Sequence, residues 1–165
     1  MTGEQHQVCL LLGSNIRAEQ NLPLAVGLLQ QEVTILQSSS IWETPSVGSS
    51  GPDFLNAALL ASTPMEAEQL KLRVLRPLEA RMGRVRSGDK NAARPIDLDI
   101  ILFDGRLMDP SLWRHAYRAV PVAEIFPDFE SARGEKLKEA AARLVRISPL
   151  QLRSDIPFHP YHQER

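Results

Sequence analysis

The order of strand-like and helix-like segments is the feature that most constrains this chain. Short apolar or β-leaning segments predict strands at 8–12, 34–43, 54–61 and 96–103. Apolar residues recurring every three or four positions predict amphipathic helices at 22–33 and from 63 to about 82. The order strand, helix, strand, strand, helix, strand predicts an α+β protein. The expected fold is a ferredoxin-like α/β sandwich with helices packed on a mainly antiparallel sheet.

Turn and capping residues mark the ends of several segments. Gly13-Ser14-Asn15 follows the first strand, and Thr44-Pro45 ends the second. In Thr63-Pro64-Met65-Glu66, threonine can cap a helix, proline suits its first position and glutamate can close a capping box. Further helices are predicted at 122–125 and 135–145. Loops are predicted at 46–53 and 83–94, and the loop at 83–94 is expected to be mobile. The segments 1–7 and 154–165 are predicted to be irregular tails.

Composition indicates one soluble domain covering residues 1–165. The chain is 43% hydrophobic and 24% charged, which argues against disorder, and its longest apolar runs are too short to span a bilayer. The single cysteine, Cys9, cannot form an internal disulfide, and residues 1–7 do not resemble a secretory signal, so we expect a cytoplasmic protein. A formal net charge of −1 excludes a generally basic nucleic-acid binder. Small molecules are the expected partners, and a monomer is the expected state.

Two aspartates give the first chemical signal. Asp97 and Asp99 are two residues apart on a predicted strand, so their carboxylates project from the same face. Two like charges are costly to bury without a cation, and hard oxygen ligands at this separation suit Mg²⁺. The alternative is the solvent-facing side of an edge strand, because an Asp-x-Asp pattern is only moderately specific.

Basic residues gather just before this pair. Between residues 71 and 94 there are eight basic and two acidic side chains. Arg73 and Arg76 fit a solvated helix face, whereas Arg84, Arg86 and Arg94 lie on the loop that leads into the acidic strand. Guanidinium groups bind phosphate oxygens while carboxylates hold the metal that bridges them. The segment therefore predicts a triphosphate–Mg²⁺ site. The chain has no Walker-type glycine-rich loop, so the protein is not a P-loop enzyme.

The chain resembles the 6-hydroxymethyl-7,8-dihydropterin pyrophosphokinases, enzymes of folate biosynthesis that transfer pyrophosphate from ATP to a pterin alcohol. The matching pieces occur in family order and span roughly residues 8–128. They are Gly13-Ser14-Asn15, Thr44-Pro45, Phe54-Leu55-Asn56-Ala57-Ala58, Gly83-Arg84-Val85-Arg86, Lys90-Asn91-Ala92-Ala93-Arg94-Pro95-Ile96-Asp97-Leu98-Asp99-Ile100, and Pro121-Val122-Ala123-Glu124-Ile125 with Pro127. Each piece is weak alone, but the ordered set is highly specific.

The resemblance implies a role for each matching residue. Asp97 and Asp99 would bind two Mg²⁺ ions that bridge the ATP phosphates, and Arg84 and Arg94 would act in catalysis by closing over the triphosphate. The implied ATP-binding residues are Glu79, Arg84, Arg86, Arg94 and His115. The implied pterin-binding residues are Thr44, Pro45, Val47, Phe54, Asn56 and Tyr117, with Asn56 reading the amide-like edge of the pterin and Phe54 and Tyr117 sandwiching its ring.

The chain departs from the family pattern in three places. Ala92-Ala93 stands where Gly-Pro is usual, and Phe54 stands where tyrosine is frequent. The stretch between Asp99 and Pro121 is about eight residues shorter than in the family and lacks a leucine-proline-histidine piece that contributes to the ATP site. His115 stands where an arginine is frequent, and it is either a cation for phosphate or a surface histidine.

These features leave four hypotheses. The first is pyrophosphoryl transfer from ATP to 6-hydroxymethyl-7,8-dihydropterin, and the second is the same chemistry on another pterin. A third is a pterin- or nucleotide-binding module without catalysis. The fourth, an RNA-binding ferredoxin-like domain, is disfavoured because the sheet has no aromatic stacking motif and the two aspartates would repel phosphate. The combination of paired acids with paired arginines favours catalysis.

Overall fold

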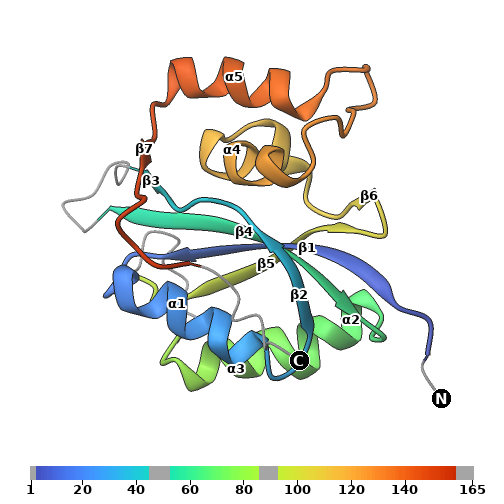
Figure 1. Ribbon diagram of the computed structural model, residues 1–165, viewed down its shortest axis with the longest axis vertical. Helices are drawn as coiled ribbons and strands as arrows, with labels where there is room; N and C mark the ends of the chain where they lie inside the picture. The colour runs from blue at the N-terminus through green and yellow to red at the C-terminus, as the bar shows by residue number, and fades with distance from the viewer. Residues whose placement is uncertain (1–2, 45–52, 86–92, 159–165) are drawn as a thin grey trace.

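We describe the protein from a computed structural model, which describes residues 3–44, 53–85 and 93–158 (Figure 1). The strands are β1 (His6–Ser14), β2 (Thr34–Ser38), β3 (Trp42–Thr44), β4 (Phe54–Thr63), β5 (Asp97–Phe103), β6 (Arg106–Leu107) and β7 (Gln151–Leu152). The helices are α1 (Ala18–Leu29), α2 (Ala67–Leu70), the π-helical η1 (Lys71–Leu75), α3 (Arg76–Arg81), the 3₁₀ helix η2 (Pro110–Trp113), α4 (Ala116–Ile125) and α5 (Leu137–Ile147).

The sheet has the strand order expected for a ferredoxin-like protein. It runs β6-β5-β1-β4-β3-β7, β2 also pairs with β4, and every pairing between strands is antiparallel. The long central pair, β1 and β4, is flanked by β5 on one side and by β2 and β3 on the other. The structure therefore confirms the α+β fold predicted from the order of segments.

Helices cover both faces of this sheet (Figure 1). One face packs against α1, α2, η1 and α3, with Leu10, Leu59 and Leu98 among the fully buried residues. The other face packs against η2 and α4, with α5 stacked outside α4, and its core includes Cys9 and Leu112. Burial raises the pKa of the Cys9 thiol to about 12, in keeping with a cysteine that serves as a small core residue.

Several element ends differ from the sequence predictions. The first helix begins at Ala18 and ends at Leu29, about four residues before the predicted bounds, because the apolar period marks the buried stripe rather than the ends. β4 runs through Thr63, and the N-cap of α2 is Glu66, whose backbone N–H donates to Gln69 Oε1 at 3.2 Å. Thr63 is thus the last residue of a strand rather than a helix cap.

The long helix after β4 changes its hydrogen-bonding pattern in the middle. The helix predicted from 63 to about 82 is helical without a break from Ala67 to Arg81, with a π-helical turn at 71–75 between α2 and α3. Pro77 lies at the start of α3 and has no N–H to donate to the carbonyl of Arg73, so regular α-helical bonding cannot continue through it. α4 also begins six residues before the short helix predicted at 122–125, with Pro121 inside it.

The predicted tails contribute to the fold where they are described. β1 begins at His6, so the expectation of an irregular segment through residue 7 was wrong at its end. Residues 153–158 form no helix or strand, yet Ile156 and Phe158 are buried in the core beside α1. Arg153 pairs with Glu19 on α1 and Glu43 on β3, each at 2.8 Å, which holds this segment against the sheet.

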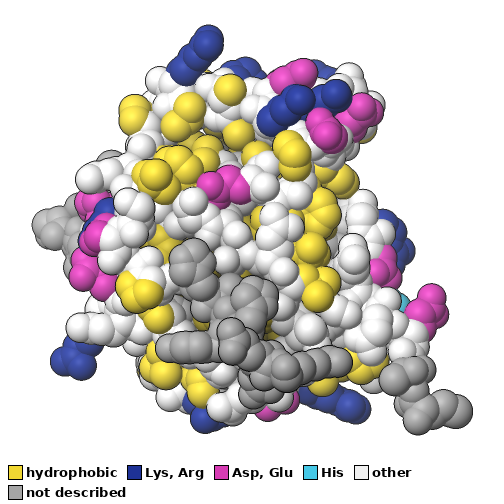
Figure 2. All heavy atoms as spheres, viewed as in Figure 1, with side chains coloured by type: hydrophobic (Ala, Val, Ile, Leu, Met, Phe, Trp, Pro, Cys, Tyr) yellow, Lys and Arg dark blue, Asp and Glu magenta, His cyan; other side chains and the backbone are white. Residues whose placement is uncertain are grey.

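Hydrophobic side chains are visible between the α4–α5 layer and the sheet in Figure 2, and charged ones gather around the N-terminal end of α5. Within residues 3–44, 53–85 and 93–158, none of the helices combines the length and the apolar composition that a membrane-spanning segment needs.

Candidate functional site

The candidate site lies on the sheet face that carries α4. Asp97 on β5 pairs with Gly13 on β1, and Gly13 pairs with Asn56 on β4, so the three residues form a row across the sheet. Neighbours in such a row share a face, as do residues two apart along a strand. Asp99 and Phe54 therefore extend the same surface. This surface is the floor of a cavity of about 630 Å³ that is closed on its other side by α4 and the end of α5.

Two arginines hold the carboxylate of Asp97. Arg84 Nη1 donates to Asp97 Oδ1 at 2.7 Å, and Arg94 Nη1 donates to Oδ2 at 3.0 Å. Arg84 lies near the start of the segment between α3 and β5, and Arg94 lies near its end. Both ends of this segment are therefore held at the carboxylate of Asp97. The arrangement brings together three residues for which the resemblance implies a catalytic role, and Asp99, the fourth, lies two residues along the same strand.

Asn15 sets the position of Arg94, a function that the sequence analysis missed. The side-chain Oδ1 of Asn15 accepts a hydrogen bond from the Arg94 backbone N–H at 2.6 Å, and the Asn15 backbone N–H donates to the Arg94 carbonyl at 3.0 Å. Asn15 is buried. The Gly13-Ser14-Asn15 motif therefore does more than end a strand, because its last residue fixes the backbone that presents a site arginine.

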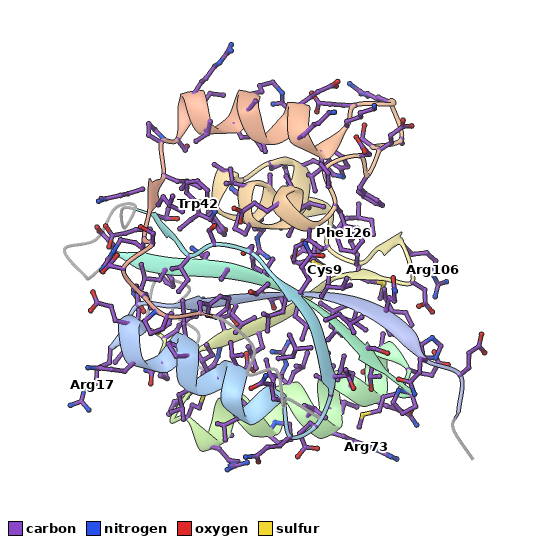
Figure 3. The ribbon with its side chains drawn as sticks, viewed as in Figure 1. Cys9, Arg17, Trp42, Arg73, Arg106 and Phe126 are labelled. Carbon is purple, nitrogen blue, oxygen red and sulfur yellow. The ribbon has the colours of Figure 1, made fainter. Side chains whose placement is uncertain are left out.

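Glu79 lies beneath the site and is not among the residues that line the cavity. Its carboxylate is 2% exposed and accepts from the Leu98 backbone N–H at 2.9 Å and from Arg76 Nη1 at 2.8 Å. Arg84 Nη1 is 3.7 Å from Glu79 Oε2. These contacts suit a residue that supports β5 and Arg84 from behind. Arg76, expected on a solvated helix face, is instead paired inward, whereas Arg73 points into solvent (Figure 3).

Asp99 has a different environment from Asp97. Burial, followed by the nearby charge of Asp97, raises the pKa of its carboxyl above the usual range. The cation nearest to it in the described structure is Arg118 on α4, whose Nη1 lies 3.6 Å from Asp99 Oδ2 and 3.0 Å from Asp109 Oδ2. Sequence reasoning missed Arg118 and Asp109, because neither belongs to a recognisable motif.

Of the predicted pterin residues that can be described, Thr44, Phe54 and Asn56 lie on the floor, on β3 and β4, and Tyr117 lies on the other side of the cavity, on α4. Thr44, Phe54, Asn56 and Tyr117 line the cavity, and Asn56 Nδ2 donates to Thr44 Oγ1 at 3.4 Å. A Cβ on Gly13 would lie 2.8 Å from Asn56 Oδ1, so glycine is needed beside this amide. Pro45, Val47 and Arg86 fall outside the described residues.

His115 also lines the cavity, as the N-cap residue of α4. Its ring stacks on Tyr117 with a centroid separation of 5.2 Å. Partial burial and the charges of Arg118 and Arg114 lower the pKa of His115 below its usual range. His115 is exposed although it lines the cavity, so its role, a cation for phosphate or a surface histidine, stays a prediction.

The two aspartates fit a magnesium ion that also binds phosphate. Mg²⁺ usually takes one or two carboxylates and completes its shell with water and substrate phosphates. In the described part of the chain, no group of three or more His, Cys, Asp and Glu side chains could hold a metal ion by itself. A pair of half-buried carboxylates inside a cavity and beside arginines suits a metal that arrives with a polyphosphate.

Comparison with known proteins points to one family. The family model described as "7,8-dihydro-6-hydroxymethylpterin-pyrophosphokinase (HPPK)" matches residues 9–127. The chain is 35% identical over 121 residues to the 2-amino-4-hydroxy-6-hydroxymethyldihydropteridine pyrophosphokinase of Methylorubrum extorquens, covering 68% of this chain and 75% of that protein. It is 29% identical over 130 residues to the folate synthesis bifunctional protein of Arabidopsis thaliana, covering 72% of this chain and 27% of that protein.

Solved structures share the fold. The crystal structure of wild-type Plasmodium falciparum HPPK-DHPS with pterin and p-hydroxybenzoate superposes with a TM-score of 0.68 at 10% identity, covering 88% of this chain and 44% of that chain. The chain thus spans about a quarter of the Arabidopsis protein and less than half of the Plasmodium one. Since the family model covers most of the chain, the protein belongs to the 7,8-dihydro-6-hydroxymethylpterin-pyrophosphokinase family.

Proposed function

We propose that the protein transfers pyrophosphate from ATP to the hydroxymethyl group of 6-hydroxymethyl-7,8-dihydropterin, giving AMP and the pterin diphosphate, a step of folate biosynthesis. The observation that carries the proposal is one cavity whose floor has paired carboxylates at one end and Asn56 at the other. Arg84 and Arg94 lie at the carboxylate end, Phe54 lies on the floor, and Tyr117 lines the cavity from α4. Such a cavity can hold a polyphosphate and a flat heterocycle side by side.

The reaction needs orientation and charge more than a covalent catalyst. The hydroxymethyl oxygen of the pterin attacks the β-phosphorus of ATP, and the bond from that phosphorus to the oxygen that bridges it to the α-phosphorus breaks. AMP leaves with the bond electrons, and the hydroxyl proton is released. Arg84 and Arg94 would stabilise the charge that develops on the phosphate oxygens. Asn56, with Thr44 beside it, would orient the pterin.

Asp97 and Asp99 would hold the magnesium ions, which supply charge neutralisation for the triphosphate. We propose that two magnesium ions bind. We also propose that Pro45 and Val47 contribute to pterin binding and that Arg86 and Glu79 contribute to ATP binding. Glu79 would act through Arg84, because its carboxylate lies behind β5. We further infer a monomer that acts in the cytoplasm without nucleic-acid or membrane partners, and light scattering of the purified protein tests the monomer.

AMP release tests the proposed reaction. Purified protein is incubated with ATP and Mg²⁺, with and without 6-hydroxymethyl-7,8-dihydropterin, and nucleotides are separated by chromatography. Pterin-dependent AMP supports pyrophosphoryl transfer, whereas pterin-dependent ADP would show a different transfer. Absence of AMP together with pterin binding in calorimetry would instead favour another pterin substrate or a binding module, the two alternatives of the same fold.

The role of Arg94 has a separate test. If Arg94 stabilises the transition state, Arg94→Ala should lower kcat by roughly 100-fold or more and change the Kd of the pterin little. Arg73→Ala, an exposed arginine on η1, is the control and should leave both values unchanged. Equal losses of kcat and of pterin affinity would contradict the assignment.

A further inference from the structure

Arg118 is a third arginine of the site, and nothing in the family resemblance assigns it a role. It lies in the first turns of α4 and lines the same cavity as Asp97 and Asp99. Its side chain is 17% exposed, and its Nη1 faces two carboxylates, Asp109 at 3.0 Å and Asp99 at 3.6 Å. Its shorter contact is with Asp109, so that residue is its anchor.

Asp109 is itself fixed in place. Its Oδ1 accepts hydrogen bonds from the Ser111 backbone N–H at 3.0 Å and from Ser111 Oγ at 2.6 Å, at the start of η2. Its other oxygen, Oδ2, accepts from Arg118. The guanidinium carbon of Arg118 also lies 5.4 Å from the centre of the Tyr117 ring. Asp109, in the short segment before α4, therefore holds Arg118 against the site, and this carboxylate does not belong to β5.

The donors of Arg118 are not exhausted by these contacts. A guanidinium has five N–H donors, and the contacts with both carboxylates use Nη1. The buried Nε has no hydrogen-bond partner among the described residues. An unpaired buried donor has an energetic cost that an anion within reach would relieve. Arg118 thus combines a fixed position, spare donors and a place on the wall of the cavity.

We propose that Arg118 binds a phosphate group of the nucleotide and that Asp109 is the residue that positions it. This inference rests on the proposed function and deepens it. In the free protein Arg118 offsets the charge of Asp99, as Arg84 and Arg94 offset that of Asp97. When Asp99 is engaged by a cation, the attraction between Asp99 and Arg118 falls, while the contact with Asp109 keeps the guanidinium in the cavity. Its charge is then available to phosphate oxygens.

Calorimetric binding of α,β-methylene-ATP with Mg²⁺ tests this without turnover, because the methylene bridge cannot be cleaved. Arg118→Gln should raise the Kd of the analogue at least about tenfold, as expected for a lost hydrogen bond to a charged group. Arg118→Lys should recover part of that loss. Arg106→Ala, an exposed arginine on β6 that lies away from the cavity-lining residues, is the matched control and should bind like the wild type (Figure 3).

The positioning role of Asp109 has its own signature. Asp109→Asn keeps an oxygen for Ser111 but loses the charge that holds Arg118, and should raise the Kd of the analogue roughly threefold to tenfold. In the Arg118→Gln background the same change should add almost nothing, because Asp109 acts through Arg118. Additive losses in the double variant would overturn the positioning role.

Two further results separate this inference from the proposed function. Unchanged analogue binding in Arg118→Gln and Arg118→Lys, with a lower Tm, would show that Arg118 is structural and would overturn the inference alone. If wild-type protein binds the analogue and Arg118→Gln weakens it, the inference holds even if no pterin-dependent AMP forms, a result that would overturn the proposed reaction alone. If wild-type protein does not bind the analogue, the inference is wrong, and pterin-dependent AMP release decides the proposed reaction separately.

Discussion

The two faces of the sheet are built from the same strands and have opposite characters. On β1, Leu10 and Leu12 face α1 and α3, whereas Leu11 and Gly13 face the cavity. On β5, Leu98 is fully buried in the first core, and its neighbours Asp97 and Asp99 are half-buried beside arginines. The face that carries α1 and α3 is covered by continuous apolar packing. The face that carries α4 has an apolar core in one part and the charged cavity in another.

The alternation of a β-strand explains how this is possible. Because successive side chains point to opposite faces, one residue can be chosen for packing and the next for chemistry without conflict. The packed face can offset the cost of placing like charges on the other. Substitutions on one face should therefore change stability, and substitutions on the other should change activity.

The sharpest test of this separation is Asp99→Asn. If Asp99 is a metal ligand, turnover should fall by roughly 10³-fold, the scale at which lost charge stabilisation affects such transfers. Stability should stay equal or rise, because the change removes one of two neighbouring buried charges while Arg118 keeps its contact with Asp109. Kinetics and differential scanning calorimetry give the two values. Asp128→Asn, an exposed aspartate beside Lys138, is the control, and a lower Tm for Asp99→Asn would show a structural carboxylate.

Adjacent leucines on β1 test the other half of the comparison. Leu10→Ala should destabilise the protein by about 2–5 kcal/mol, because the residue is fully buried among well-packed neighbours. Leu11→Ala should cost less stability, because Leu11 already borders the cavity, and should alter ligand affinity more. Urea unfolding and calorimetric titration would measure both. Similar stability losses and equal affinities for the two variants would show that the faces are not functionally distinct.

Most of the fold could be predicted from the sequence because its determinants are local. Strand-length apolar runs and helical periods place β1, α1, β4 and β5 in the right order. The ends of the helices were less predictable. Pro23 lies inside α1 and Pro121 inside α4, whereas the local sequence pattern predicts a later start for both helices. The β5–β6 hairpin was missed although Asp104-Gly105, with φ of 49° and 76°, is a typical two-residue turn signal.

The site could be predicted only where residues belong to a motif. Asp97, Asp99, Arg84 and Arg94 occur within matching segments, and the structure brings them to one place. Arg118 and Asp109 are brought to Asp99 by the packing of α4 on the sheet, which no local pattern records. Glu79 illustrates the converse, because the resemblance implied a place in the ATP site, but its carboxylate accepts from the backbone of β5 and does not line the cavity.

Gly13→Ala should act through the neighbouring strand. The added methyl group would meet Asn56 Oδ1 at 2.8 Å, so the amide must move from its place beside Thr44. We expect pterin affinity to fall about tenfold, the loss typical of a displaced hydrogen-bonding group, with nucleotide affinity nearly unchanged. Gly27→Ala, which meets no atom within 4 Å on α1, is the control. Equal loss of both affinities would indicate a general distortion of the sheet.

The smallest effect is expected at the opposite end of the sheet from the site. His6 Nδ1 lies 2.6 Å from Asp104 Oδ2, and His6 Nε2 lies 3.3 Å from Glu66 Oε1, which joins β1 to the β5–β6 turn and to the start of α2. The hydrogen bond with Asp104 raises the pKa of His6 above 6.5 and lowers that of Asp104 below 3.8. None of these groups lines the cavity.

The sign of the pH effect follows from these directions. Because the pKa of His6 is higher in the folded protein, its contribution to stability is complete below pH 6.5 and is lost as pH rises through the raised pKa. The Tm difference between wild type and His6→Gln should therefore shrink from pH 6 to pH 8.5, while ligand affinities at each pH match. Asp104→Asn keeps a residue that tolerates positive φ and should remove most of this dependence. A Tm difference that stays constant with pH would show that His6 contributes by packing on Phe103, at 4.9 Å, rather than by charge.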